Sequence, residues 1–284
     1  MKRNVYLVDL GTASNRNLLP LGVGLISAYC ESLADLSSSF NFNVHFLRGA
    51  TNDIINSFDA PYVVGYAMYV WNFRASLRLS AATKAAYPDA VLVAGGYSIP
   101  KDPERVRLFF QEYPQFDIVV HGEGEFTFAE VMRALSSGSD LQNVEGISFR
   151  SNLVPEGFLT TTKRERISDL NVLPSPYLNG VFDDILLKHK DMVTGVIWET
   201  NRGCPFSCTF CDWGNADVIK LKSFDMDRLS AEIDWISKNN IFYIYLADAN
   251  FGILYDRDLE IAENIANACK KSGYRAGVCV FPYS

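Results

Sequence analysis

The sequence has 284 residues, of which 48% are apolar, 13% aromatic and 21% charged. Its net charge of −7 at pH 7 is unlike the basic balance of proteins that bind phosphate backbones, so we expect no nucleic-acid partner. No apolar run approaches the roughly 20 residues of a membrane span. The six cysteines are too unevenly spaced for a disulfide framework, which indicates a reducing, cytoplasmic setting.

Residues 1–139 alternate short apolar runs with segments of helical period. The runs that predict strands are residues 4–10, 43–49, 62–70, 91–96 and 116–122. The segments that predict helices are residues 21–33, 74–87, 103–113 and 128–138. Short apolar runs separated by helices are typical of strands covered on both faces, so this part predicts an α/β fold with a doubly wound, parallel, Rossmann-like sheet. Such a sheet binds its ligand at the carboxyl ends of its strands.

The alternation stops over residues 140–192. The sequences EGISFR and SNLVPEGF, at residues 145–158, predict a small hairpin, and the segment after them is expected to be a linker. The run KRER at residues 163–166 is expected to be a solvated part of this linker, and contact with a cofactor phosphate is the alternative.

Strand and helix signals return over residues 193–284, which we expect to form a second domain. The predicted strands are residues 193–200, 241–251 and 275–281, and the predicted helices are residues 224–240 and a segment that ends at Gly273. The chain is therefore expected to have three parts: a sheet domain over 1–139, a hairpin and linker over 140–192, and a β/α domain over 193–284.

Three cysteines lie within eight positions directly after the first strand of this second domain. Cys204, Cys208 and Cys211 have the spacing C-x3-C-x2-C. Thiolates on one tight loop can hold three corners of a 4Fe–4S cluster, which leaves one iron open for a substrate. Structural zinc is the alternative, but it needs four ligands, and no fourth Cys or His has the usual local spacing. The motif therefore favours an iron–sulfur cluster.

The stretch RGCPFSCTFC resembles the signature of the radical S-adenosylmethionine (SAM) superfamily. The resemblance implies that the open iron binds the amino and carboxylate groups of SAM and that Phe210 packs beside the adenine. It also implies that one electron from the cluster cleaves SAM into methionine and a 5′-deoxyadenosyl radical. Residues 193–284 are then expected to form the first half of a (β/α)6 partial barrel of the TIM type.

The segment LADANFG follows the second strand of this domain, where family members bind the methionine amino group of SAM. Asp248 and Asn250 are the candidates there by their position. The alternative is that both side chains cap a turn or the following helix, as Asp and Asn often do.

The sheet domain resembles the cobalamin-binding domain of one large branch of that superfamily. GEGE follows the fifth predicted strand, paired glycines end the fourth, and 25 residues lie between Tyr69 and Gly95, close to the interval in cobalamin-binding folds. Glycines let the backbone approach a ligand, and glutamates accept hydrogen bonds from its amides. The cobalamin contacts implied by the resemblance are Tyr69, Trp71, Gly95, Gly96, Gly122, Glu123, Gly124 and Glu125. No G-x-G-x-x-G follows the first strand, which disfavours a dinucleotide.

Many cobalamin proteins carry D-x-H-x-x-G after the first strand, so that the histidine binds cobalt from below. The corresponding loop here, residues 9–17, contains no histidine, and His45 and His121 lie in or at the end of strands. We therefore expect cobalamin without a histidine lower ligand, with Trp71 shielding the lower face from water. The alternative is that Trp71 is an aromatic of the core or of a hinge.

The resemblance implies an enzyme that methylates an unactivated carbon of a natural product or peptide, with a flavodoxin or ferredoxin as electron donor. A cobalamin-dependent radical cyclase or rearrangement enzyme is an alternative. Barrels of this superfamily usually have six β/α units, whereas three strands are predicted from residue 193 onward. We therefore expect either a fragment of a longer enzyme or a shortened cobalamin-binding protein without turnover. No catalytic acid or base can be named from this sequence.

Overall fold

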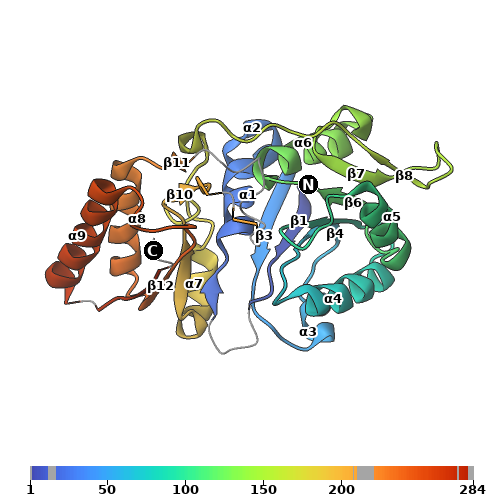
Figure 1. Cartoon of the computed structure of the whole chain (residues 1–284). Helices are drawn as coiled ribbons and strands as arrows, with labels where there is room; N and C mark the ends of the chain where they lie inside the picture. The colour runs from blue at the N-terminus through green and yellow to red at the C-terminus, as the bar shows by residue number, and fades with distance from the viewer. Residues whose placement is uncertain (1, 12–16, 207, 210–220, 274, 281–284) are drawn as a thin grey trace. The chain divides into compact units, whose positions relative to one another are not determined.

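The computed structural model describes residues 2–11, 17–206, 208–209, 221–273 and 275–280 (Figure 1). The chain divides into two compact units, one formed by residues 1–15 and 22–167 and the other by residues 16–21 and 168–284. Phe210 and Cys211 lie outside the described residues. Among the described helices, none has both the length and the apolar character needed to cross a lipid bilayer.

A seven-stranded sheet in the order β3-β1-β4-β5-β6-β7-β8 forms the centre of the first unit. Its strands are β1 (Arg3–Val8), β3 (Phe40–His45), β4 (Pro61–Ala67), β5 (Val91–Gly95), β6 (Ile118–Val120), β7 (Ile147–Arg150) and β8 (Phe158–Thr160). The first five are parallel, which confirms the predicted doubly wound sheet. The predicted hairpin is β7 and β8, and it pairs antiparallel with β6, so it extends this sheet.

Helices cover both faces of this sheet (Figure 1). One face carries α1 (Leu21–Ser32), α2 (Ala34–Ser39) and α6 (Gly124–Ser137), and the other carries α3 (Thr51–Asn56), α4 (Phe73–Ala86) and α5 (Pro103–Glu112). A short 3-10 helix, η1 (Leu141–Asn143), follows α6. The chain winds to opposite sides after β1 and after β4, so the switch point of the topology lies between these two strands. In parallel sheets this is where a ligand binds.

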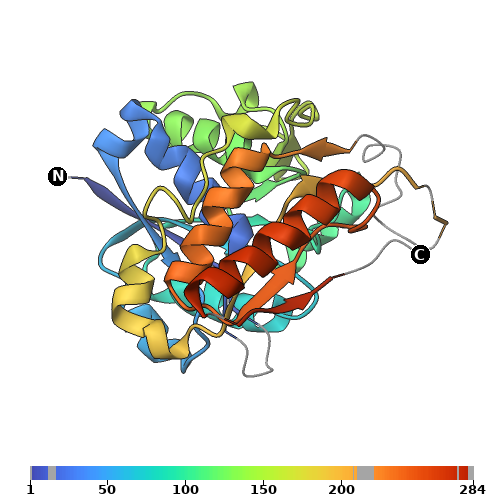
Figure 2. The same cartoon turned by 90° about the vertical axis from the view of Figure 1, so that its left-hand side faces the viewer.

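The second unit contains a parallel four-stranded sheet in the order β13-β12-β9-β2. Its strands are β9 (Gly195–Trp198), β12 (Tyr243–Leu246), β13 (Gly277–Cys279) and β2 (Leu18–Leu19). The helices α8 (Met226–Lys238) and α9 (Tyr255–Ser272) lie side by side on it (Figure 2). The three β strands expected from residue 193 are therefore present, in the β/α order of a partial barrel.

The remaining elements of this unit are short. They are the 3-10 helices η2 (Leu170–Val172) and η3 (Lys190–Met192), the helix α7 (Asp183–His189), and the antiparallel pair β10 (Asn201–Arg202) and β11 (Lys222–Ser223). The strand β2 was not predicted. It comes from the segment between β1 and α1, and its two residues pair with Gly195 and Val196 of β9.

Candidate cofactor sites

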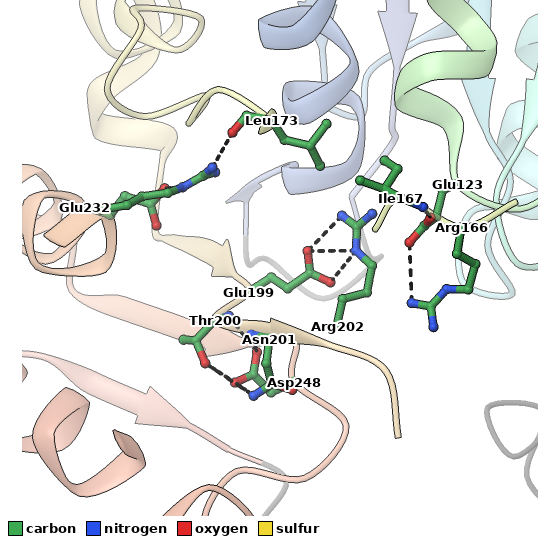
Figure 3. Close-up of polar contacts among 11 residues, drawn as sticks. Glu123, Arg166, Ile167, Leu173, Glu199, Thr200, Asn201, Arg202, Glu232 and Asp248 are labelled. Atoms are coloured by element: carbon green, nitrogen blue, oxygen red, sulfur yellow. Dashed lines mark hydrogen bonds and ion pairs between the residues drawn. The ribbon is translucent and has the colours of Figure 1, made fainter. Parts of the chain in front are cut away.

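The cysteine motif follows β9 and β10 and is preceded by a buried hydrogen-bond network around Asp248 (Figure 3). Asp248 lies two residues after the end of β12, the neighbour of β9. Its Oδ1 accepts hydrogen bonds from the backbone N–H of Thr200 at 2.7 Å and of Asn201 at 3.2 Å. Its Oδ2 accepts one from Asn201 Nδ2 at 2.9 Å and another from the Thr200 hydroxyl. The carboxylate therefore fixes the segment that leads to Cys204.

Burial raises the pKa of the Asp248 carboxyl from 3.8 to about 6, and the hydrogen bonds from Thr200 and Asn201 oppose this rise. A buried carboxylate is stable when donors satisfy its oxygens, as they do here. These bonds reach a segment 48 residues earlier in the chain, so they are neither the turn cap nor the helix cap that was the alternative. Direct contact between Asp248 and SAM stays a prediction.

Arg257 on α9 supports the same segment from a distance of 57 residues along the chain. It donates from Nη2 to the carbonyl oxygen of Thr200 at 2.5 Å and from Nη1 to the Thr200 hydroxyl at 3.1 Å. Its neighbour Asp258 is buried and accepts hydrogen bonds from the backbone N–H of Gly252 at 2.7 Å and of Leu254 at 3.2 Å. The start of α9 therefore anchors both loops at this edge. Nothing in the local sequence pattern around Arg257 and Asp258 indicates these contacts.

Cys204 is buried and Cys208 is exposed. Asn250, in the loop after β12, donates from its side-chain amide to Cys204 Sγ at 3.1 Å. The sulfur thus lies at the carboxyl edge of the sheet and acts as a hydrogen-bond acceptor, which suits a thiolate ligand of iron. Within the described part of the chain, no three His, Cys, Asp or Glu residues are grouped to hold a metal ion. Cys204 and Cys208 belong to one loop, as the cysteine ligands of iron–sulfur clusters often do, so these two residues fit that group.

Glu199 and Arg202 flank the Asp248 network (Figure 3). Arg202 Nη2 lies 2.9 Å from Glu199 Oε2, and both side chains are mostly buried. This ion pair joins the two ends of the turn between β9 and β10. It adds a further constraint on the backbone that enters the cysteine loop at Gly203, whose φ of +118° favours glycine.

The GEGE sequence of the first unit lies at the start of α6. Gly122 has φ +76°, and no atom of the described residues lies within 4 Å of the position that a Cβ would take. A Cβ on Gly124 would lie 3.0 Å from the Ile26 side chain. Glu125 is buried in the first turn of α6.

Glu123 contacts Arg166 and Ile167, the last two residues of the first unit (Figure 3). Its carboxylate accepts a hydrogen bond from the backbone N–H of Ile167 at 2.7 Å and contacts Arg166 Nη2 at 3.4 Å. Arg164 pairs with Glu130 of α6. The side chains of Arg164 and Arg166 are 15% and 22% exposed, so the prediction of a solvated linker at KRER is wrong for these two residues. They pack against α6 because carboxylates there neutralise them.

The switch point between β1 and β4 is tied together by polar contacts. Asn72 Nδ2 donates to Asp9 Oδ1 at 2.9 Å, and Asn72 Oδ1 accepts from the N–H of Tyr69 at 2.8 Å. Burial raises the pKa of Asp9 from 3.8 to about 7, and the Asn72 hydrogen bond opposes this rise. Arg48 donates to the carbonyl oxygens of Gly11 at 2.5 Å and of Trp71 at 2.8 Å. Arg48 and Asn72 were not predicted as site residues.

Tyr69 and Trp71 stack with their ring centroids 4.7 Å apart and their planes 11° from parallel. Trp71 is 49% exposed, which excludes a place in the core. It lines a cavity of about 530 Å³ together with Arg48, Arg74 and Arg78. The stacked pair therefore presents an accessible aromatic surface beside a basic pocket at the carboxyl edge of the sheet.

The paired glycines end β5 on the same edge. Gly96 has φ +103°, and a Cβ there would lie 2.9 Å from the carbonyl oxygen of Met68. A Cβ on Gly95 would lie 3.7 Å from the Val120 side chain, which is an ordinary contact. Glycine is thus required at residue 96, because the backbone after β5 lies close to the backbone after β4 here.

His45 and His121 each contact another residue of the first unit. His45 Nε2 lies 2.9 Å from the carbonyl oxygen of Leu47, and His121 Nε2 lies 2.8 Å from the Ser148 hydroxyl. Burial lowers the pKa of His121, so its imidazole is neutral at pH 7.

Together these features define a class: a two-unit α/β protein with a C-x3-C-x2-C motif after β10 in one unit, and with glycines and stacked aromatic rings at the carboxyl edge of the sheet in the other. The cobalamin-dependent radical SAM methyltransferase TokK of Streptomyces tokunonensis is 37% identical over 270 residues, which cover 94% of this chain and 38% of that protein. The 2-(S-pantetheinyl)-carbapenam-3-carboxylate methyltransferase of Streptantibioticus cattleyicolor is 37% identical over 277 residues, which cover 95% of this chain and 39% of that protein. The chain therefore belongs to the cobalamin-dependent radical SAM enzymes.

The fold agrees with this assignment. The solved structure of the cobalamin-dependent S-adenosylmethionine radical enzyme OxsB, with aqua-cobalamin and S-adenosylmethionine bound, covers 98% of this chain and 38% of that one, with a TM-score of 0.72 and 20% identity. The chain thus spans about two fifths of the length of the relatives it matches. No family model matches the sequence.

Proposed function

We propose that this chain binds the cofactors of a radical SAM methyltransferase that transfers a methyl group to an unactivated carbon. The observation that carries the proposal is the cysteine loop at the carboxyl edge of the second sheet, held by Asp248 and contacted by Asn250. The similarity to two methyltransferases over more than nine tenths of the chain supports it. One of these relatives is named for a carbapenam carboxylate, so a small natural product is a better first substrate to test than a peptide.

In this proposal Cys204, Cys208 and Cys211 hold a 4Fe–4S cluster. When bound, the cluster would supply the electron that cleaves SAM, and cobalamin would carry the methyl group. Asp248 holds the loop in place. Asn250 Oδ1 makes no hydrogen bond within the described part of the chain and can accept one from the amino group of SAM. Phe210 is proposed to pack beside the adenine, and a flavodoxin or ferredoxin is proposed as the electron donor.

Cobalamin is proposed to bind at the carboxyl edge of the first sheet. Backbone at the glycines would approach it closely, and Glu123 and Glu125 would orient the loop and accept hydrogen bonds. The stacked Tyr69 and Trp71 would cover its lower face without a histidine ligand, which the half-exposed position of Trp71 supports. The proposed backbone contacts are Gly95, Gly96, Gly122 and Gly124.

The test is turnover of SAM by the protein reconstituted without oxygen with iron, sulfide and hydroxocobalamin. With a reductant, the wild type is expected to form S-adenosylhomocysteine and 5′-deoxyadenosine, and the variant Cys204→Ala/Cys208→Ala is expected to lose 5′-deoxyadenosine. Cys279→Ala, on a strand away from the motif, is the matched control and should keep both products. If 5′-deoxyadenosine forms without S-adenosylhomocysteine, the protein carries out radical chemistry without methyl transfer and the methyltransferase proposal is wrong.

A further inference from the structure

The side chain of Asn250 is held in a rigid frame. Two residues before it, Asp248 accepts hydrogen bonds from the backbone N–H groups of Thr200 and Asn201. Two residues after it, Gly252 donates its N–H to buried Asp258 at 2.7 Å. The loop is thus fixed at both ends, and the amide of Asn250 is directed at Cys204 Sγ at 3.1 Å. A donor fixed in this way keeps a constant hydrogen bond to a metal-ligating atom.

A hydrogen bond to a cluster sulfur changes how easily the cluster accepts an electron. One electron from a reduced ferredoxin- or flavodoxin-type donor adds one unit of negative charge to a 4Fe–4S cluster and changes no covalent bond. A donor N–H at a ligating sulfur stabilises the more negative state, and hydrogen bonds to the sulfurs are among the factors that set cluster potentials. Cys204 is buried, so water competes little for its sulfur, and the amide has a larger effect than it would on an exposed thiolate.

We propose that Asn250 is a positioning residue that raises the reduction potential of the cluster through its hydrogen bond to Cys204. This inference rests on the proposed function, because it assumes that Cys204 holds a cluster. In this proposal the two polar atoms of the Asn250 side chain have different partners. The amide nitrogen donates to the Cys204 sulfur, and the amide oxygen is available to SAM. The sulfur contact operates whether or not SAM is present.

The test is a redox titration of the reconstituted full chain, followed by electron paramagnetic resonance in the absence of SAM. Asn250→Leu removes the amide with little change in volume. Asn250→Ala also removes the donor and adds no charge, so it serves if Asn250→Leu does not fold. Asn264→Leu is the matched control, because it removes an amide that donates to the Ser230 hydroxyl at 3.2 Å on the helices α8 and α9. Iron content and the Kd for SAM are measured on the same samples.

We expect wild type, both Asn250 variants and the control to hold about four irons per chain. At the wild-type midpoint potential, the ratio of reduced to oxidised cluster should fall about five-fold in the Asn250 variants, the size of one hydrogen bond, and stay unchanged in the control. An unchanged midpoint in the Asn250 variants, with or without weaker SAM binding, would overturn the inference and leave the proposed function standing. Wild-type protein that takes up no iron would overturn both, and this is seen before any potential is measured.

Discussion

The carboxylate of Asp248 binds the backbone N–H of Thr200 at 2.7 Å and joins the carboxyl ends of two neighbouring parallel strands, β12 and β9. The two residues are 48 positions apart in the sequence. Because the cysteine motif begins a few residues after Thr200, this contact sets where the motif leaves the sheet. The same carboxylate also accepts hydrogen bonds from Asn201, so its loss would leave several buried donors without an acceptor.

Asp248→Ala is therefore expected to destabilise the second unit by about 2–4 kcal/mol, since each buried donor left without a partner costs about 1–3 kcal/mol. Urea unfolding followed by tryptophan fluorescence measures this, because Trp198 and Trp235 both lie in this unit. Asp234→Ala, on the exposed side of α8, is the control and should change stability little. Equal effects of the two substitutions would show that Asp248 does not hold the segment.

Asp9 predicts a pH dependence of stability. Its folded pKa of about 7 lies above the ordinary value of 3.8, so the folded state binds the proton more tightly than the unfolded state. The stabilising contribution is full below about pH 4 and is lost as the pH rises through 7, by up to about 4 kcal/mol. Asp9→Asn stays neutral and still accepts from Asn72, so it should be more stable than the wild type at pH 8 and differ little at pH 4.

The measurement for Asp9 is urea unfolding at several pH values between 4 and 8. The difference between variant and wild type isolates this residue from other titrating groups. Asp89→Asn, at an exposed position, should show no such pH-dependent difference. A variant curve parallel to the wild type over the whole range would contradict the raised pKa of Asp9.

We expect the substitution Glu123→Ala to make residues 164–167 more sensitive to protease. Its contacts with Ile167 and Arg166 hold the segment that ends the first unit, so Glu123→Ala should release it. Limited trypsin digestion followed by mass spectrometry should then show cleavage after Arg164 or Arg166 at least several-fold faster than in the wild type. Glu156→Ala, at an exposed site in the β7–β8 hairpin, should leave these rates unchanged. Equal rates in all three proteins would contradict this role of Glu123.

We expect alanine to lower the free energy of unfolding by different amounts at Gly96 and Gly122. Gly96→Ala adds a Cβ 2.9 Å from a backbone oxygen at φ +103°, whereas Gly122→Ala adds one into open space at φ +76°. The strain of a left-handed residue alone is about 1–2 kcal/mol, so Gly122→Ala should lose about that much and Gly96→Ala clearly more. Thermal unfolding of both variants at one pH compares them, and a larger loss for Gly122→Ala would contradict the geometry.

Most strands of the first sheet could be predicted because they are buried on both faces and read as continuous apolar runs. The run at residues 62–70 is β4 and that at 91–96 is β5. The strand β3 is Phe40–His45, not 43–49, because FNFNVH alternates apolar and polar residues and its start carries no apolar run. The two-residue strand β2 has no period at all, so nothing in the sequence indicates it.

Candidate site residues could be predicted where a motif is formed by residues close together in the sequence. They could not be predicted where a contact joins residues far apart in the sequence. The spacing of Cys204 and Cys208 is visible in the sequence, and so is the GEGE turn. The contacts of Arg257 with Thr200 join residues 57 positions apart, and those of Arg48 join loops that meet only in the folded sheet. Such partners are fixed by strand order and register, which the sequence pattern alone does not specify.

The most direct test of two cofactors on two units is their content per chain. The protein reconstituted without oxygen with iron, sulfide and hydroxocobalamin is desalted, and iron and cobalt are quantified beside the variant Cys204→Ala/Cys208→Ala/Cys211→Ala. We predict about four irons and one cobalamin in the wild type, and loss of iron with retention of cobalamin in the variant. Iron without cobalamin, or zinc in place of iron, would contradict this account.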